Sequence, residues 1–143
     1  MGIDVPTWCR SYAAPESTAA TIDKSELKKD IEENPEGILI IDLRREDFEG
    51  GNIKGSYNIP AQSIYGYEGI SKIVKLAEST KVNKVIFHCK LSRDRATRSA
   101  GWFQDYVKKH NIEDIQGVVL SGGILEWVSG GDDYTQLMEG FDQ

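Results

Sequence analysis

A cysteine and an arginine six positions apart are the residues of this chain best suited to act together chemically. Cys89 ends an apolar stretch, and Arg95 opens a segment with helical spacing. A thiolate is a strong nucleophile. A guanidinium is a planar, permanently charged fork that matches two oxygens of a tetrahedral oxyanion such as phosphate or arsenate. The seven residues therefore predict a nucleophile, a cradle and a clamp for such an anion.

The segments on either side of this loop predict a strand before it and a helix after it. Residues 84–88 are mostly apolar and β-branched or aromatic, as in a strand that is covered on both faces. Beyond the loop, apolar side chains recur at helical spacing, at Ala96, Ala100, Phe103 and Val107. The start of a helix carries unpaired amides and a partial positive charge, which favour both an oxyanion and a thiolate. Basic residues gather in the same segment, at Lys90, Arg93, Arg95 and Arg98.

Each part of the loop has an expected role. Cys89 is the expected nucleophile and Arg95 the clamp, while backbone amides of residues 90–94 hold the anion's oxygens. The predicted oxyanion-binding loop comprises Lys90, Leu91, Ser92, Arg93, Asp94 and Arg95. Ser92 either donates to the thiolate or the anion, or is simply solvated; His88 is expected to hydrogen-bond within the loop region. The alternative for the whole motif is a buried structural cysteine beside a solvated arginine.

Composition favours one soluble globular domain and excludes several classes of function. The chain has 143 residues, 39% of them hydrophobic, which is enough for a sizeable core. Its 17 basic and 23 acidic residues give a net charge of −6, which argues against nucleic-acid binding. No apolar run reaches the roughly 20 residues of a bilayer span, and the N-terminus lacks a secretory signal. We therefore expect no membrane association and a cytoplasmic location, with the nucleus left open.

The cysteines and histidines do not predict a metal site. Cys9, Cys89, His88 and His110 lack the spacing of zinc ligands. A disulfide between two distant cysteines is disfavoured in the cytosol, so Cys9 is not expected to act as a resolving thiol. The sequence gives no indication of the oligomeric state.

Strand and helix patterns alternate along the chain and predict an α/β fold with a mainly parallel sheet. We expect residues 1–19 to form an N-terminal arm and residues 20–143 a single catalytic domain. Asp23 and Glu26 resemble a capping pair for a helix that runs to Glu33. Strands are predicted at residues 20–22, 38–41, 56–60, 84–88 and 117–120, and further helical segments at 46–49, 69–79, 96–110, 124–128 and 134–141.

Three motifs, in the family's order, resemble the Cdc25-like branch of the rhodanese superfamily. They are Ile41-Asp42-Leu43-Arg44 with residues 48–60, then His88-Cys89-x5-Arg95, then Leu120-Ser121-Gly122-Gly123 with Trp127. The resemblance covers about residues 20–130. Within this branch, the chain is similar to small single-domain members such as Acr2-type arsenate reductases. It implies a single rhodanese-like domain with a five-stranded, mainly parallel sheet flanked by helices.

Loop length separates the branches of this family. In the sulfurtransferases of this family the loop has the shorter pattern Cys-x4-Arg or similar. The longer Cys-x5-Arg loop is typical of members that bind phosphate or arsenate. The resemblance therefore implies a cysteine-dependent phosphatase of phosphotyrosine or dual-specificity type, without a cofactor, acting on phosphorylated proteins or small phosphates. The alternative is an arsenate reductase that uses glutathione or glutaredoxin. A sulfurtransferase and a non-catalytic rhodanese module are less favoured.

The resemblance also bears on the residues beside the arginine. Asp94 matches the position of a glutamate proposed as the general acid in Cdc25 proteins, but Arg93 and Arg95 favour its charged form. Many relatives have Gly-Pro after the arginine, whereas Ala96 and Thr97 follow here. Ala96 has no hydroxyl to assist departure of the thiol.

Other residues have mainly structural interpretations. Asp42 and Arg44 are expected to form an ion pair that fixes the loop after their strand, rather than to act in catalysis. Trp127 is expected to pack in the core. Tyr65 and Tyr67 either border the substrate site or lie on the surface.

Overall fold

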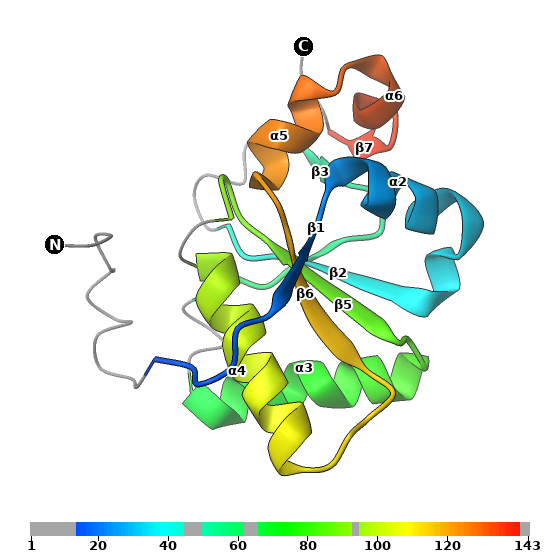
Figure 1. Ribbon diagram of the computed structural model, residues 1–143. Helices are drawn as coiled ribbons and strands as arrows, with labels where there is room; N and C mark the ends of the chain where they lie inside the picture. Colours follow the sequence, from blue (N-terminus) through cyan, green and yellow to red (C-terminus); the bar gives the residue numbers. More distant parts are fainter. Residues whose placement is uncertain (1–13, 45–49, 62–65, 93–94, 141–143) are drawn as a thin grey trace, which may run out of the picture.

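A parallel sheet of five strands forms the centre of the computed structural model, which describes residues 14–44, 50–61, 66–92 and 95–140 (Figure 1). The strand order is β1-β6-β5-β2-β4, so β5 lies in the middle. The strands are β1 (Ala20–Ile22), β2 (Ile38–Asp42), β4 (Tyr57–Asn58), β5 (Lys84–His88) and β6 (Gln116–Leu120). Because all neighbours are parallel, the carboxyl ends of the strands meet at one edge of the sheet, where α/β proteins bind ligands.

Helices cover both faces of this sheet. The helical elements are α2 (Lys24–Glu33), the 3-10 turn η1 (Pro35–Gly37), α3 (Gly66–Thr80), α4 (Arg95–Lys109), α5 (Gly123–Ser129) and α6 (Asp132–Thr135). Helices α3 and α4 pack on one face, and α2 and α5 lie on the other (Figure 1). The expected α/β fold with a five-stranded parallel sheet and flanking helices is confirmed.

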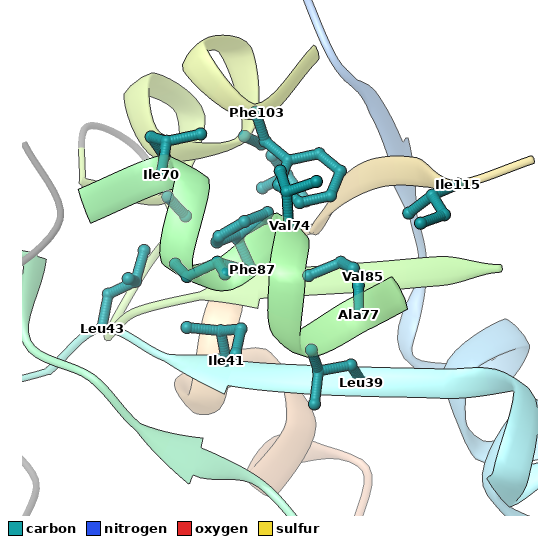
Figure 2. Packing of buried hydrophobic residues seen from close by; sticks show 14 of the residues in the cluster. Leu39, Ile41, Leu43, Ile70, Val74, Ala77, Val85, Phe87, Phe103 and Ile115 are labelled. Atoms are coloured by element: carbon teal, nitrogen blue, oxygen red, sulfur yellow. The ribbon is translucent and has the colours of Figure 1, made fainter. Parts of the chain in front are cut away.

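The alternation of side chains along β5 divides the core between the two faces. Val85 and Phe87 point to α3 and α4, where Phe87 meets Phe103 edge to face at a centroid distance of 5.6 Å (Figure 2). Ile86 packs on the opposite face with the α2 and α5 side chains, which include the fully buried Trp127. The packing role predicted for Trp127 is thus confirmed. Since β5 is covered on both faces, its position is fixed by the cores themselves.

Residues 14–19 lie against α4 before they enter β1. The backbone amides of Glu16 and Ser17 donate to the carboxylate of Asp105 at 2.9 and 2.8 Å. Gly101 allows this approach, because a Cβ at that position would lie 2.6 Å from the Pro15 ring. These contacts attach the segment that precedes β1 to the helix that follows the candidate loop.

The C-terminal part corrects one prediction. A helical turn was expected over residues 134–141, but α6 ends at Thr135 and a strand, β7 (Met138–Glu139), pairs antiparallel with β3 (Asn52–Ile53). Met138, one of the apolar residues whose spacing suggested a helix, is instead a strand residue whose side chain is buried in the core with α2 and α5. Strand β3 was not predicted, since its pairing depends on a partner more than eighty residues away. Phe141 and the turn expected at residues 46–49 lie outside the described residues.

The remaining boundaries agree closely with the sequence patterns. The strands expected at residues 20–22, 38–41, 84–88 and 117–120 are present, and Asp23 caps α2 by accepting from the Glu26 amide at 2.8 Å. The strand expected over residues 56–60 contains only Tyr57 and Asn58. Beyond it, the Ile59 amide still donates to the carbonyl of Asp42 in β2, and the Ala61 amide donates to the carbonyl of the next residue, Leu43. Helix α3 begins three residues before the predicted position 69.

Candidate active site

Cys89 directly follows the central strand β5, at the edge of the sheet where the carboxyl ends of the strands meet. Its side chain is a free thiol and is buried, with 3% of its surface exposed. Helix α4 begins at Arg95, and its first turn contains no acidic residue. The positive end of the α4 dipole is therefore not neutralised by its own first turn, which suits a bound anion or a thiolate.

The carbonyl groups of the loop are held by α5. The Ile124 amide donates to the Cys89 carbonyl at 3.0 Å, and the Leu125 amide donates to the Lys90 carbonyl at 3.2 Å. Described peptide bonds are trans, so the N–H of each peptide points opposite to its C=O. The amides of Lys90 and Leu91 consequently point away from α5 and are available to a ligand. This arrangement places two amide donors on the side of the loop opposite to α5.

Gly123 makes this contact between α5 and the loop possible. Its φ of +63° is in the left-handed region, and a Cβ there would lie 2.5 Å from both the Cys89 and the Lys90 carbonyl oxygens. No side chain fits at that distance, so only glycine lets the first turn of α5 approach. From sequence alone the Ser-Gly-Gly motif indicated only a turn. Its role as the support of the loop was missed, although a double glycine before a short helix was the available signal.

Two hydrogen bonds connect Ser92 to the start of the loop and to helix α4. The Cys89 amide donates to the Ser92 hydroxyl oxygen at 3.4 Å, and the Thr97 hydroxyl donates to the Ser92 carbonyl at 3.4 Å. Ser92 adopts a left-handed backbone conformation, with φ of +56°, and only 9% of its surface is exposed. Its oxygen is thus used inside the loop, which does not fit the alternative of simple solvation.

A buried ion pair lies at the end of β2, beside β5. The Arg44 guanidinium contacts the Asp42 carboxylate through Nη2 at 2.7 Å and through Nε at 3.0 Å, and both residues are at most 2% exposed. Nη2 of Arg44 also donates to the Gly51 carbonyl at 2.8 Å. The expected structural pair is confirmed, and it ties the end of β2 to the segment that enters β3.

His88 lies between this ion pair and the loop. Its Nδ1 is 3.4 Å from the Cys89 carbonyl oxygen, and its Nε2 is 4.0 Å from the Asp42 carboxylate. Since a carbonyl only accepts, this contact assigns the proton to Nδ1, and the buried Nε2 is then without a hydrogen-bond partner among the described residues. The expected hydrogen bond within the loop region is confirmed. Burial lowers the pKa of His88 below its usual 6.5, and Arg44 adds to this while Asp42 opposes it. The imidazole is therefore neutral near pH 7 and serves as a donor to the loop backbone.

The other predicted residues fall into two groups. Arg95 is half-buried at the first position of α4, and Lys90 and Leu91 are exposed beside the thiol. The strand, loop and helix thus bring Cys89 and Arg95 to one end of the sheet. Arg93, Asp94, Cys9, Tyr65 and the side chain of Tyr67 lie outside the described residues. Within the described ranges, no group of three or more His, Cys, Asp or Glu side chains is placed to hold a metal ion, and no helix is long and apolar enough to cross a membrane.

A family model places the chain among known proteins. The model of the rhodanese-like domain matches residues 23–130, which include β2, β4, β5 and β6 of the sheet and the candidate loop. The match thus extends over the elements that position Cys89.

Individual relatives are similar over most of their length. Arsenical-resistance protein 2 of Saccharomyces cerevisiae is 29% identical over 74% of this chain and 85% of its own length. Dual specificity phosphatase ibp1 of Schizosaccharomyces pombe is 29% identical over 73% of each chain. The solved structure of the As-Sb reductase from Leishmania major is 30% identical, covers 84% of each chain and superposes with a TM-score of 0.71.

The substitution Gly123→Ala tests whether α5 orders the loop. We expect a loss of about 1–3 kcal/mol in the free energy of unfolding from the left-handed backbone. Anion binding should fall as well, because the Cβ would push the two carbonyls away. Gly131→Ala is the control, since Gly131 also has a positive φ, +86°, but nothing lies within 4 Å of its Cβ position. Titration calorimetry with inorganic phosphate should show weaker binding only for Gly123→Ala; equal affinities in both variants would contradict the role of Gly123.

The buried His88 predicts a pH dependence of stability. Its pKa is lowered in the folded protein, so the unfolded chain binds a proton that the folded chain does not as the pH falls below 6.5. The wild type should therefore lose about 1 kcal/mol more stability than His88→Gln between pH 7.5 and pH 5.5. Urea unfolding at the two pH values measures this difference. A wild-type dependence on pH that matches that of His88→Gln would contradict the lowered pKa of His88.

Proposed function

This chain belongs to the rhodanese-like domain family, and from that premise we propose that it is a cysteine-dependent phosphatase of phosphotyrosine or dual-specificity type. One observation carries the proposal most strongly. The peptides that follow the buried Cys89 thiol have their carbonyls bonded to α5, which leaves the Lys90 and Leu91 amides for a tetrahedral anion. The name of the fission yeast relative, a dual specificity phosphatase, agrees with it.

In the first step, the Cys89 thiolate attacks the phosphorus of a phosphomonoester. The S–P bond forms as the bond to the ester oxygen breaks, so an alkoxide or aryloxide leaves and a phosphocysteine remains. The Arg95 guanidinium and the loop amides bind the equatorial oxygens, whose arrangement changes most in the transition state. The neutral His88 supports the loop through the Cys89 carbonyl.

In the second step, water attacks the phosphocysteine and inorganic phosphate is released. The thiolate leaves and is stabilised by the amino-terminal end of α4. Ala96 is buried and has no hydroxyl to assist, and the Thr97 hydroxyl already donates to the Ser92 carbonyl. We therefore expect hydrolysis of the phosphocysteine to limit turnover.

Protonation of the leaving oxygen is assigned to Asp94. Its position in the loop is the reason, but the flanking Arg93 and Arg95 favour the charged carboxylate and make Asp94 a poor proton donor. Esters whose oxygen leaves without prior protonation, such as aryl phosphates, would then be the better substrates. Phosphorylated proteins and small phosphates, met in the cytoplasm or the nucleus, are the proposed partners.

Arsenate reduction is the second candidate for the same loop. Two relatives carry names that point to it, an arsenical-resistance protein and an As-Sb reductase. Arsenate shares the charge and shape of phosphate. The Cys89 thiolate would bind arsenic and displace one arsenate oxygen as water. Two thiols, one from glutathione and one from glutaredoxin, would then reduce As(V) to As(III) by two electrons and end as a mixed disulfide.

Hydrolysis of para-nitrophenyl phosphate tests the phosphatase. Cys89→Ser should abolish the activity, because a serine hydroxyl is not ionised near neutral pH. Arg95→Lys should lower kcat/KM on the order of 10² because the bidentate clamp is lost. Circular dichroism of both variants checks that they fold. A rate for Cys89→Ser equal to that of the wild type would refute the mechanism.

Formation of arsenite tests the second candidate. The wild type is incubated with arsenate, glutathione and glutaredoxin, and arsenite is measured beside Cys89→Ser. We expect arsenite formation to be slow relative to ester hydrolysis, with both lost in Cys89→Ser. Arsenite formation without hydrolysis of any ester would make the protein an arsenate reductase and reject the phosphatase.

A further inference from the structure

Ser92 adopts a backbone conformation that serine seldom takes. Its φ of +56° lies in the left-handed region, which glycine enters without a steric cost and most other residues do not. In the described part of the chain, two further non-glycine residues have a positive φ, Lys81 and Asn111, and both are exposed in turns. Ser92 is instead buried, three residues after the nucleophile. An unfavourable conformation beside a reactive group indicates that the serine side chain has a role that glycine could not fill.

The amide of Cys89 lies just beyond the end of the sheet. The pairing of β5 with β2 ends at His88, and its pairing with β6 ends at Phe87. Cys89 is only 3% exposed, and a buried N–H without a partner is costly. The Ser92 hydroxyl oxygen accepts this N–H at 3.4 Å. The Ser92 side chain thus supplies the partner that the neighbouring strands do not.

This hydrogen bond acts together with two others on the peptide groups that flank the Cys89 Cα. In the peptide that precedes Cys89, the His88 carbonyl accepts the Leu43 amide at 2.9 Å. In the peptide that follows, the Cys89 carbonyl accepts the Ile124 amide at 3.0 Å. Because each peptide is planar, holding both planes also fixes the direction of the Cα–Cβ bond that carries the thiol. Of the three supports, the bond to Ser92 comes from within the loop.

We propose that Ser92 is a positioning residue, whose hydroxyl oxygen holds the Cys89 amide and thereby keeps the thiol aligned with an anion bound by the loop. The assignment rests on the proposed phosphatase and names a residue that places its nucleophile. It depends on the oxygen as an acceptor, and three substitutions separate that property from the backbone conformation.

The three substitutions at Ser92 differ in what they keep. Alanine keeps the Cβ, and with it the unfavourable backbone, but has no oxygen. Glycine lacks the oxygen and removes the steric cost. Asparagine enters the left-handed region more readily than most residues, and its side-chain oxygen is an acceptor. The placement of the thiol should therefore follow the oxygen, whereas the stability of the fold should also follow the backbone.

Iodoacetate and iodoacetamide measure how well the thiol and the loop are aligned. With either reagent the Cys89 thiolate displaces iodide and a C–S bond forms, but only iodoacetate has a carboxylate for the loop amides and Arg95 to bind. Mass spectrometry follows alkylation at Cys89, and the ratio of the two rates is divided by the ratio for glutathione. The wild type should favour iodoacetate. Ser92→Ala and Ser92→Gly should each lower this preference about fivefold, the effect of one ordinary hydrogen bond, and Ser92→Asn should retain it.

Urea unfolding of the same variants separates alignment from stability. Ser92→Gly should be more stable than Ser92→Ala, because only alanine retains the steric cost of a positive φ. Lys81→Gly is the matched control. Lys81 has a φ of +60° and is exposed in the turn between α3 and β5, at the opposite end of β5 from Cys89. Its replacement relieves the same backbone conformation and should leave the preference for iodoacetate unchanged.

Three results would overturn the assignment: a preference for iodoacetate that survives in Ser92→Ala, a loss in Ser92→Ala that Ser92→Gly restores, or an equal loss in Ser92→Asn. The second result would mean that only the backbone conformation matters, and the third that an acceptor is not sufficient. A wild type without any preference would refute the anion-binding loop and this role with it.

Hydrolysis of para-nitrophenyl phosphate by the wild type, measured separately, tests the phosphatase itself. Hydrolysis together with an unchanged preference in Ser92→Ala would refute the positioning role alone. A preference that depends on the Ser92 oxygen, without hydrolysis of any ester, would keep the positioning role and reject the phosphatase.

Discussion

The hydrogen bonds from the first amides of α5 to the Cys89 and Lys90 carbonyls are the constraint on which the candidate site depends. A loop after a strand has backbone groups of both polarities, and an anion is attracted to one kind and repelled by the other. By binding the carbonyls from behind, α5 leaves the opposite sides of those peptides to present their N–H groups. Gly123 is required at this contact because any side chain would enter the space of the carbonyl oxygens.

A second layer of interactions supports the same peptide from β2. The Cys89 carbonyl also receives the Nδ1–H of the buried His88, whose other nitrogen faces Asp42. Asp42 is in turn neutralised by Arg44, which reaches on to the Gly51 carbonyl. A buried ion pair contributes little stability by itself, because desolvation offsets the attraction. Its value in this position is geometric, because it fixes the end of β2, where the Leu43 amide donates to the His88 carbonyl at 2.9 Å.

The site is therefore supported from three segments that are distant in the chain. Strand β5 is fixed by apolar packing on both of its faces, α5 binds the loop from one side, and the end of β2 supports it through His88. Residues 14–19 are attached to α4 through Asp105, so the helix whose dipole faces the loop is also held from its outer side. Displacement of any one of these supports changes where the loop amides point.

The sequence by itself determined the parallel α/β fold, the strand and helix around Cys89 and the residues of the loop, because these follow from local periodicity and from a short motif. It also indicated the Asp42–Arg44 pair, whose partners are two residues apart. Tertiary structure alone decided which group binds the loop carbonyls, since Ile124 and Leu125 are more than thirty residues away and act through backbone amides that every sequence has. The β3–β7 pairing was hidden for the same reason. Such contacts depend on how distant segments are packed, and no local pattern encodes them.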